Sequence, residues 1–189
     1  MLGNSEDIKR RKSLSCATFS KNKTILCTNQ RPLQSRMRSF KCFVEPVFLY
    51  NCELWTLTCA DNNKIDSFQR NFLRQIVRTK DITNKRLYTV CNTDPWSKTI
   101  QKRRLAWFGH LIRLPEQTSA KQAFWEAKST FSKKVAGGQP MTWLSTIRKD
   151  FKQVNKSLTE AQIIAQNKVE YKRLTGSVMS HVKKPAQRL

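Results

Sequence analysis

The sequence predicts an all-α protein: an irregular helical bundle, followed by a linker and a small C-terminal helical segment. Three observations support this fold class. Only five of the 189 residues are glycine, strictly alternating apolar and polar runs are few, and apolar residues recur at helical spacing over long segments. Hydrophobic residues make up 39% of the chain and include ten Phe and five Trp, so we expect a packed core rather than a disordered chain.

Residues 1–60 are expected to form the N-terminal helices. The acidic pair Glu6-Asp7 suits the start of a helix over about residues 5–20, because carboxylates are favourable near a helix N-terminus. After a polar connector, apolar residues at helical spacing predict a second helix over about residues 33–54. Pro46 should kink or break it.

Residues 61–127 are expected to form the helical core. The strongest periodicity predicts a helix over about residues 62–79, with Asp61 as its N-cap. A second strong helix is predicted over about residues 95–114, with Asp94 as N-cap before a proline in the first helical position. A shorter helix should cover about residues 119–128.

The last third of the chain contains weaker patterns. Residues 128–141 are interpreted as a linker, because they combine lysines with a Gly-Gly pair and a proline. Residues 142–175 are predicted to form a C-terminal helical segment. Residues 176–189 are predicted to be a disordered basic tail.

The charge balance indicates the class of partner. Lys and Arg total 36 against 13 Asp and Glu, so the formal net charge is +23, and the excess is spread along the whole chain. Such a chain attracts polyanions, which makes nucleic acid the expected partner and an anionic membrane surface the lesser alternative. No apolar run is long enough to span a bilayer and no signal peptide is visible. We therefore expect an intracellular protein, nuclear or cytoplasmic, with no membrane and no small-molecule substrate.

The first candidate binding surface is a row of arginines on the helix predicted over residues 62–79. Arg70, Arg74 and Arg78 recur at every fourth position, so they should follow one face with a spacing of about 6 Å per turn. This spacing is comparable to that of phosphates along a strand. The alternative is an ordinary solvated helix face.

The second candidate surface belongs to the helix predicted over residues 95–114. Lys102, Arg103 and Arg104 directly precede the aromatic pair Trp107-Phe108. Basic residues beside aromatic residues can bind a phosphate backbone and stack bases. However, both aromatic residues lie on the apolar stripe of the helix, so burial in the core is the stronger expectation for them.

The sequence offers no candidate catalytic residue, metal ligand set or cofactor motif. Phosphoryl transfer by polymerases and nucleases uses paired carboxylates that hold metal ions, and the only adjacent acids are Glu6 and Asp7 at a predicted helix start. The six cysteines form no CxxC pair, and the two histidines lie far from them. Catalysis by this chain alone is therefore not expected.

Four segments, in order, resemble the C-terminal thumb and post-thumb region of non-LTR (LINE-type) retrotransposon endonuclease-reverse transcriptases. They are Phe48–Leu57, Phe68–Arg74, Arg103–Pro115 and Gly138–Leu144. Six residues of these segments are the structural motif positions: Trp55, Trp107, Phe108, Gly109, His110 and Trp143. The chain departs from the family pattern at Asn51-Cys52, where Gly-Ser is usual, and at the weakly basic approach to Gln139.

The resemblance implies a thumb-like helical bundle that helps to hold the template–primer duplex during reverse transcription. In that family the catalytic aspartates lie in the palm, upstream of the matching segments, and Mg²⁺ is expected only with that palm. The family's endonuclease domain has no counterpart in this sequence.

Three functional hypotheses follow. The first is a nucleic-acid-binding fragment of this mobile element that grips duplex or RNA through Arg70, Arg74, Arg78, Lys102, Arg103 and Arg104. The second is a truncated form of an active RNA-directed DNA polymerase whose palm lies upstream. The third is an inert helical relic of the element. The sequence does not distinguish RNA, DNA and hybrid duplex as ligands.

Overall fold

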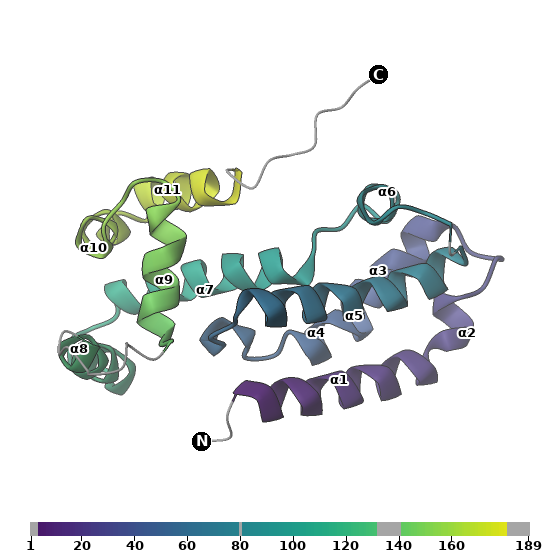
Figure 1. Cartoon of the computed structure of the whole chain (residues 1–189), viewed down its shortest axis with the longest axis horizontal. Helices are drawn as coiled ribbons and strands as arrows, with labels where there is room; N and C mark the ends of the chain where they lie inside the picture. Colours follow the sequence, from purple (N-terminus) through teal and green to yellow (C-terminus); the bar gives the residue numbers. More distant parts are fainter. Residues whose placement is uncertain (1–3, 80, 132–140, 181–189) are drawn as a thin grey trace. The chain divides into compact units, whose positions relative to one another are not determined.

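A computed structural model describes residues 4–79, 81–131 and 141–180. Every regular element in this described part is helical, which confirms the predicted all-α class (Figure 1). The chain divides into two compact units, Met1–Ile100 and Gln101–Leu189, called here the N-terminal and the C-terminal unit. The division falls inside one helix.

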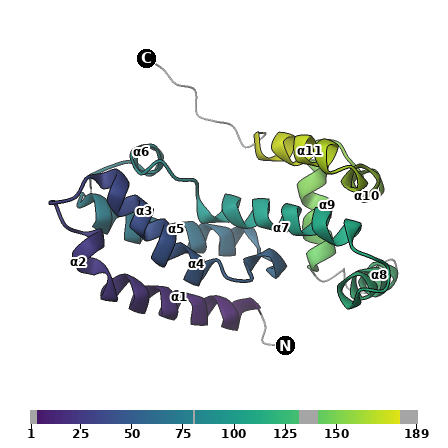
Figure 2. The ribbon, with the colours of Figure 1, turned by 180° about the vertical axis from the view of Figure 1, so that it is seen from behind.

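The N-terminal unit contains α1 (Asn4–Lys21), α2 (Lys23–Leu26), α3 (Leu33–Phe43), α4 (Glu45–Phe48), the 3-10 turn η1 (Cys52–Leu54), α5 (Cys59–Val77), α6 (Asn84–Val90) and the start of α7 (Trp96–Arg113). The C-terminal unit contains the rest of α7, α8 (Ser119–Phe131), α9 (Trp143–Lys152), α10 (Leu158–Gln166) and α11 (Lys168–Ser180). Within the N-terminal unit, α4 packs on α1 and α3, and α3 also packs on α5 (Figure 2).

The helix expected over residues 33–54 is broken, as the proline predicted. Its first part ends at Phe43, and a separate short helix with Pro46 in its first turn follows. Asn51 then takes a left-handed conformation with φ of 59°, which a helix interior does not allow, and a 3-10 turn completes the segment. The residue that replaces glycine in the family pattern thus occupies a backbone conformation that favours glycine or asparagine.

The predicted N-cap of α5 is wrong by one turn. Thr58 is the N-cap: its hydroxyl accepts from the Asp61 backbone N–H at 3.1 Å, and the Asp61 carboxylate accepts from the Thr58 backbone N–H at 3.1 Å. This is a reciprocal capping box, in which the acid occupies the third helical position. Hydrogen bonds from Thr58 lower the pKa of Asp61.

The start of α7 is capped by side chains of α5 rather than by Asp94, which was the predicted N-cap. Asp66 accepts from the Ser97 backbone N–H at 2.9 Å, and Gln69 accepts from the Trp96 backbone N–H at 2.8 Å. Gln69 also donates to the Asp94 carbonyl at 3.0 Å. The unpaired donors of the first turn are therefore satisfied by tertiary contacts, which local sequence does not reveal.

The core of the N-terminal unit is an aromatic cluster around Trp96. This side chain is fully buried, and its ring stacks on Phe48 with centroids 4.3 Å apart and on Phe40 with centroids 6.1 Å apart. Phe68 and Phe72 of α5 lie within 6.3 Å of the same ring. The Trp96 indole N–H donates to Glu45 at 2.9 Å, so the polar edge of the buried ring is satisfied.

The boundaries predicted for the C-terminal third need correction. α8 continues to Phe131, so residues 128–131 are helical rather than linker, and the rest of that linker up to residue 140 lies outside the described residues. α11 runs through Gly176 to Ser180, so the first five residues of the expected disordered tail are helical. A Cβ at Gly176 would meet nothing within 4 Å, and the helix simply continues past a glycine that costs it about 1 kcal/mol.

The predicted core of residues 61–127 also spans the division between the units. Trp96 and Ile100 of α7 pack in the core of the N-terminal unit, whereas Leu105 and Phe108 pack in that of the C-terminal unit. A single helix thus contributes to two cores, and helical periodicity continues unchanged through such a boundary.

The capping of α10 predicts that the stability of its first turn depends on pH. Ser157 is the N-cap, and the Glu160 carboxylate accepts a hydrogen bond from the Ser157 backbone N–H at 2.8 Å. This hydrogen bond is the largest of the causes that lower the pKa of Glu160 from 4.5 to about 2. A lowered carboxylate pKa stabilises the folded state above the unfolded-state value, and this stabilisation is lost as the pH falls from 4.5 toward 2.

We therefore expect the first turn of α10 to fray over that interval. In a carboxyl-detected NMR titration of the intact protein, Glu160 should titrate near 2, and the midpoint should rise in Ser157→Ala, which removes the reciprocal hydroxyl contact. A Glu160 midpoint at the ordinary 4.5 in the unchanged protein would contradict the capping box.

Candidate nucleic-acid interface

The arginine row of α5 is largely engaged with α6. Arg74 donates to the Asn84 side chain at 2.7 Å, and Arg70 lies beside Tyr88, four residues further along α6. Burial raises the pKa of Tyr88, while the Arg70 contact acts in the opposite direction. Two members of the predicted row thus help to hold a neighbouring helix, so their guanidinium groups are only partly available to a ligand.

The third member of that row does not continue the helix. Arg78 is the C-cap of α5, with φ of 62° in the left-handed region, and its side chain is exposed. Its backbone N–H donates to the Arg74 carbonyl at 2.8 Å, which closes the last turn. The regular spacing expected from Arg70 to Arg78 therefore holds only for the first two residues.

A different surface on α7 is more exposed to solvent. Lys102, Arg103 and His110 are exposed, and Trp107 is half-buried. At 100° per residue these four positions share one side of the helix, so we refer to them as the α7 basic face. All four belong to the C-terminal unit.

The aromatic part of this face has a defined arrangement. The rings of Trp107 and His110 are 5.4 Å apart between centroids and inclined by 40°. Trp107 also packs on the core of the C-terminal unit, which limits its motion. Burial in the core was expected for both aromatic residues. Phe108 is 0% exposed, which confirms it, whereas Trp107 packs on the core but is only half-buried. His110, expected to be structural, contributes an exposed imidazole edge.

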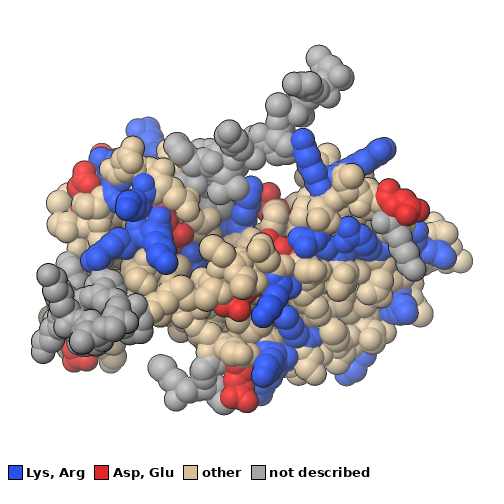
Figure 3. Space-filling model, in the orientation of Figure 1, with Lys and Arg blue, Asp and Glu red and all other residues tan. Residues whose placement is uncertain are grey.

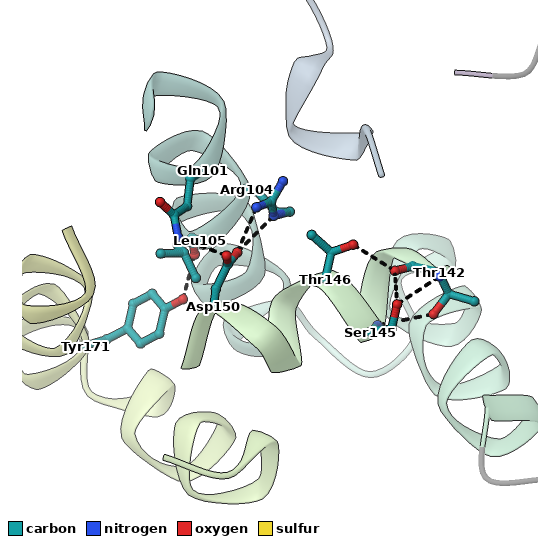
Figure 4. A network of polar contacts seen from close by, with 8 residues as sticks. All are labelled: Gln101, Arg104, Leu105, Thr142, Ser145, Thr146, Asp150 and Tyr171. Carbon is teal, nitrogen blue, oxygen red and sulfur yellow. Dashed lines mark hydrogen bonds and ion pairs between the residues drawn. The ribbon is translucent and has the colours of Figure 1, made fainter. Parts of the chain in front are cut away.

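Arg104 does not belong to the α7 basic face, although its sequence neighbours Lys102 and Arg103 do. Its guanidinium donates twice to one carboxylate oxygen of Asp150, at 3.0 and 2.8 Å, and both side chains are 7% exposed (Figure 4). Gln101 donates to the other carboxylate oxygen at 2.9 Å. Burial raises the pKa of Asp150, and Arg104 and Gln101 oppose that effect. Arg104, predicted to contact nucleic acid, is instead buried in this ion pair, which joins α7 to α9.

The sequence contained a sign of this pairing. Arg104 lies four residues from both Ile100 and Phe108, which places it on the apolar stripe of α7. Asp150 likewise lies beside Ile147 and Phe151 on the inner face of α9. Opposite charges on two apolar faces indicate a buried ion pair, since unpaired charges are too costly to bury.

Gly109 has a packing role. A Cβ on Gly109 would lie 2.2 Å from a ring carbon of Tyr171, so only glycine lets α11 approach α7 this closely. Tyr171 is buried, and its hydroxyl donates to the Leu105 carbonyl at 2.6 Å (Figure 4). Burial raises the pKa of this hydroxyl far above its ordinary value. In the segment from Leu105 to His110, residues on one side of α7 therefore pack against other helices, and residues on the other side form an exposed surface.

The two outlying motif tryptophans are structural. Trp55 is buried, and its indole N–H donates to Asp7 at 2.9 Å, which ties the segment before α5 to α1. Trp143 is half-buried and packs on the core of the C-terminal unit, near Phe108.

Within the described ranges, no group of three or more His, Cys, Asp or Glu residues is arranged to hold a metal ion. No helix in that same part of the chain is long and apolar enough to cross a membrane.

The chain was also compared with known proteins. A scan against protein-family models found no matching family, and searches of curated proteins and of solved structures found no match either.

Proposed function

We propose that this chain is a nucleic-acid-binding helical protein that contacts template–primer duplex or RNA through the α7 basic face, inside the cell and without a catalytic centre of its own. The observation that carries the proposal is the pairing of two exposed cations with the half-buried Trp107 ring and the exposed His110 ring on one side of α7. Lys102 and Arg103 are suited to phosphates, and the Trp107–His110 pair offers a surface on which a base can stack. The net charge of +23 supplies the long-range attraction.

The resemblance of the segment Arg103–Pro115 to retrotransposon reverse transcriptases supports the same ligand class. In that family the corresponding region accompanies a polymerase, so we infer that the chain derives from such an element. Any role of Mg²⁺ would belong to the polymerase's palm. The contribution of this chain is to hold the nucleic acid, with phosphate contacts fixing position and ring stacking adding affinity without sequence preference.

The test is a pair of matched double variants of the intact protein. Lys102→Gln/Arg103→Gln removes two positive charges from the α7 basic face, and Arg148→Gln/Lys149→Gln removes the same two charge types from exposed positions of α9 in the same unit. Each lost phosphate contact should weaken binding roughly five- to eight-fold in 0.1 M salt, so the first variant should lose roughly 25- to 60-fold. The second variant should retain nearly full affinity.

Fluorescence anisotropy with labelled single-stranded RNA, DNA duplex and RNA–DNA hybrid, repeated at several salt concentrations, provides the measurement. The slope of log K against log salt should fall by about 1.4 to 1.8 in the first variant only. Binding that does not depend on salt would contradict the proposal. An equal loss in both variants would show that only the overall field of the protein matters.

A further inference from the structure

A small cavity opens between the first turns of α1 and α5 in the N-terminal unit. Its volume is about 200 Å³, and its lining comes from one side of each helix: Ser5, Ile8, Lys9 and Lys12 of α1, and Asp61, Lys64 and Ile65 of α5. We propose that this cavity, called here the lysine pocket, binds a phosphate group. It is separate from the α7 basic face, and neither the arginine row nor any family motif includes its lysines.

The pocket is held open by contacts on both of its sides. The side-chain amide of Asn4 donates to the carbonyl and the hydroxyl of Thr56, and Asp7 accepts from the Trp55 indole N–H. The first turn of α1 is therefore attached to the segment that leads directly into α5. The capping box of Thr58 and Asp61 fixes the α5 side. These contacts place the three lysines on a fixed backbone rather than on mobile loops.

The charge of the lining favours an anion. The lining residues include three lysines and one carboxylate, so their formal net charge is 3 − 1 = +2. Asp61 uses one of its oxygens for the Thr58 backbone N–H and hydroxyl, at 3.1 and 2.6 Å, so part of its charge is already directed at the helix end. Lysine and arginine side chains gather over α1 and α5 on the face of this unit that Figure 3 shows.

Two further features strengthen the preference for an anion. The lining residues lie in the first three turns of α1 and the first two of α5, so the positive ends of both helix dipoles lie close to the pocket. The ammonium group of Lys12 is 5.6 Å from the ring centroid of Phe68, which restricts that side chain. Ile8 and Ile65 provide the apolar part of the lining.

The volume of the pocket favours a small anion over a larger organic ligand. Its volume of about 200 Å³ is below the range of roughly 300–1,000 Å³ typical of sites that enclose a small organic ligand. A phosphate group fits this limit, and its negative charge complements the lysines. The phosphate can come from a phosphodiester of a nucleic-acid strand or from free polyphosphate, and the two sources are separable by experiment.

The probe for the pocket itself is inorganic tripolyphosphate, added to the ¹⁵N-labelled intact protein. The backbone amides of Ser5, Lys9, Lys12, Asp61 and Lys64 should shift in the NMR spectrum. Lys9→Gln/Lys64→Gln should weaken this binding roughly ten-fold or more, because hydrogen bonds to charged groups are lost. Lys21→Gln/Lys23→Gln, which removes two exposed lysines of the same unit outside the pocket, should change it less than roughly two-fold. Equal losses in the two variants, or shifts confined to other segments, would overturn the proposal.

A labelled oligonucleotide identifies the source of the phosphate. If the pocket takes a phosphodiester, Lys9→Gln/Lys64→Gln also weakens oligonucleotide binding and lowers its salt slope; if it takes only free polyphosphate, oligonucleotide affinity is unchanged. Both results support a phosphate pocket, provided that tripolyphosphate binding is lost. The Lys102→Gln/Arg103→Gln variant should leave the tripolyphosphate shifts in α1 and α5 unchanged, so failure of the α7 proposal and failure of the pocket proposal are distinguishable.

Discussion

Replacing Asp150 with alanine should destabilise the C-terminal unit by about 3–5 kcal/mol, because it leaves the Arg104 guanidinium buried without its counter-charge. In the unchanged protein the guanidinium donates two hydrogen bonds to one oxygen of Asp150. Because the Arg104 side chain is only 7% exposed, water would not replace these hydrogen bonds in the variant. Gln101 also loses its acceptor. Urea unfolding followed by circular dichroism, with hydrogen exchange of α7 and α9 amides to localise the effect, provides the measurement.

The matched control is Glu170→Ala, which makes the same change of net charge at an exposed position of α11. It should cost less than about 0.5 kcal/mol. A second variant, Arg104→Met/Asp150→Leu, removes both charges and should recover most of the lost stability, since a buried pair is often replaceable by apolar residues of similar volume. If Asp150→Ala and Glu170→Ala prove equally mild, the ion pair has no structural role and Arg104 returns to the list of candidate ligands for nucleic acid.

The buried ion pair of Arg104 and Asp150 separates features that the sequence predicts from features that depend on packing. The helices α5 and α7 were predicted within a few residues, because their apolar stripes are long and strongly periodic. Arg104 was grouped with Lys102 and Arg103 because the three are adjacent in sequence. Adjacent residues of a helix point 100° apart, so the same run supplies two exposed cations and one buried cation.

The helix ends were less predictable for a physical reason. Capping can be local, as in Thr58 with Asp61, or tertiary, as in Asp66 and Gln69 of α5 at the start of α7. Only the local kind leaves a pattern in the sequence, and even there the acid in the third position was mistaken for the N-cap. Tertiary capping depends on how two helices pack, which no spacing rule contains.

The two candidate binding surfaces also differ in whether local sequence or tertiary packing determines them. The α7 basic face was predictable in part, because cations next to aromatic residues form a recognisable pattern. The lysine pocket was not, because Lys9 and Lys12 are separated from Lys64 by more than fifty residues and meet only through folding. Their common location depends on the contacts of Asn4 with Thr56 and of Asp7 with Trp55, which unite α1 with the segment before α5.

Trp96→Ala should destabilise the N-terminal unit by about 3–5 kcal/mol, which is the cost of a cavity left by a fully buried tryptophan. The ring stacks on Phe48 and Phe40, and Phe68 and Phe72 also surround it, so partners from α3, α4 and α5 would lose contacts at once. Urea unfolding of the intact protein, with hydrogen exchange of α3 and α5 amides, measures the loss.

Two variants separate packing from hydrogen bonding. Trp96→Phe keeps an aromatic ring but removes the indole N–H that Glu45 accepts at 2.9 Å, and we expect it to recover most of the stability that Trp96→Ala loses. Tyr50→Ala removes an aromatic side chain that is 62% exposed in the same unit, next to Arg11, and should cost about 1 kcal/mol or less. A loss in Trp96→Ala no larger than that in Tyr50→Ala would mean that the aromatic cluster is not the stabilising core of this unit. A full loss in all three variants would instead indicate that the unit tolerates no aromatic substitution.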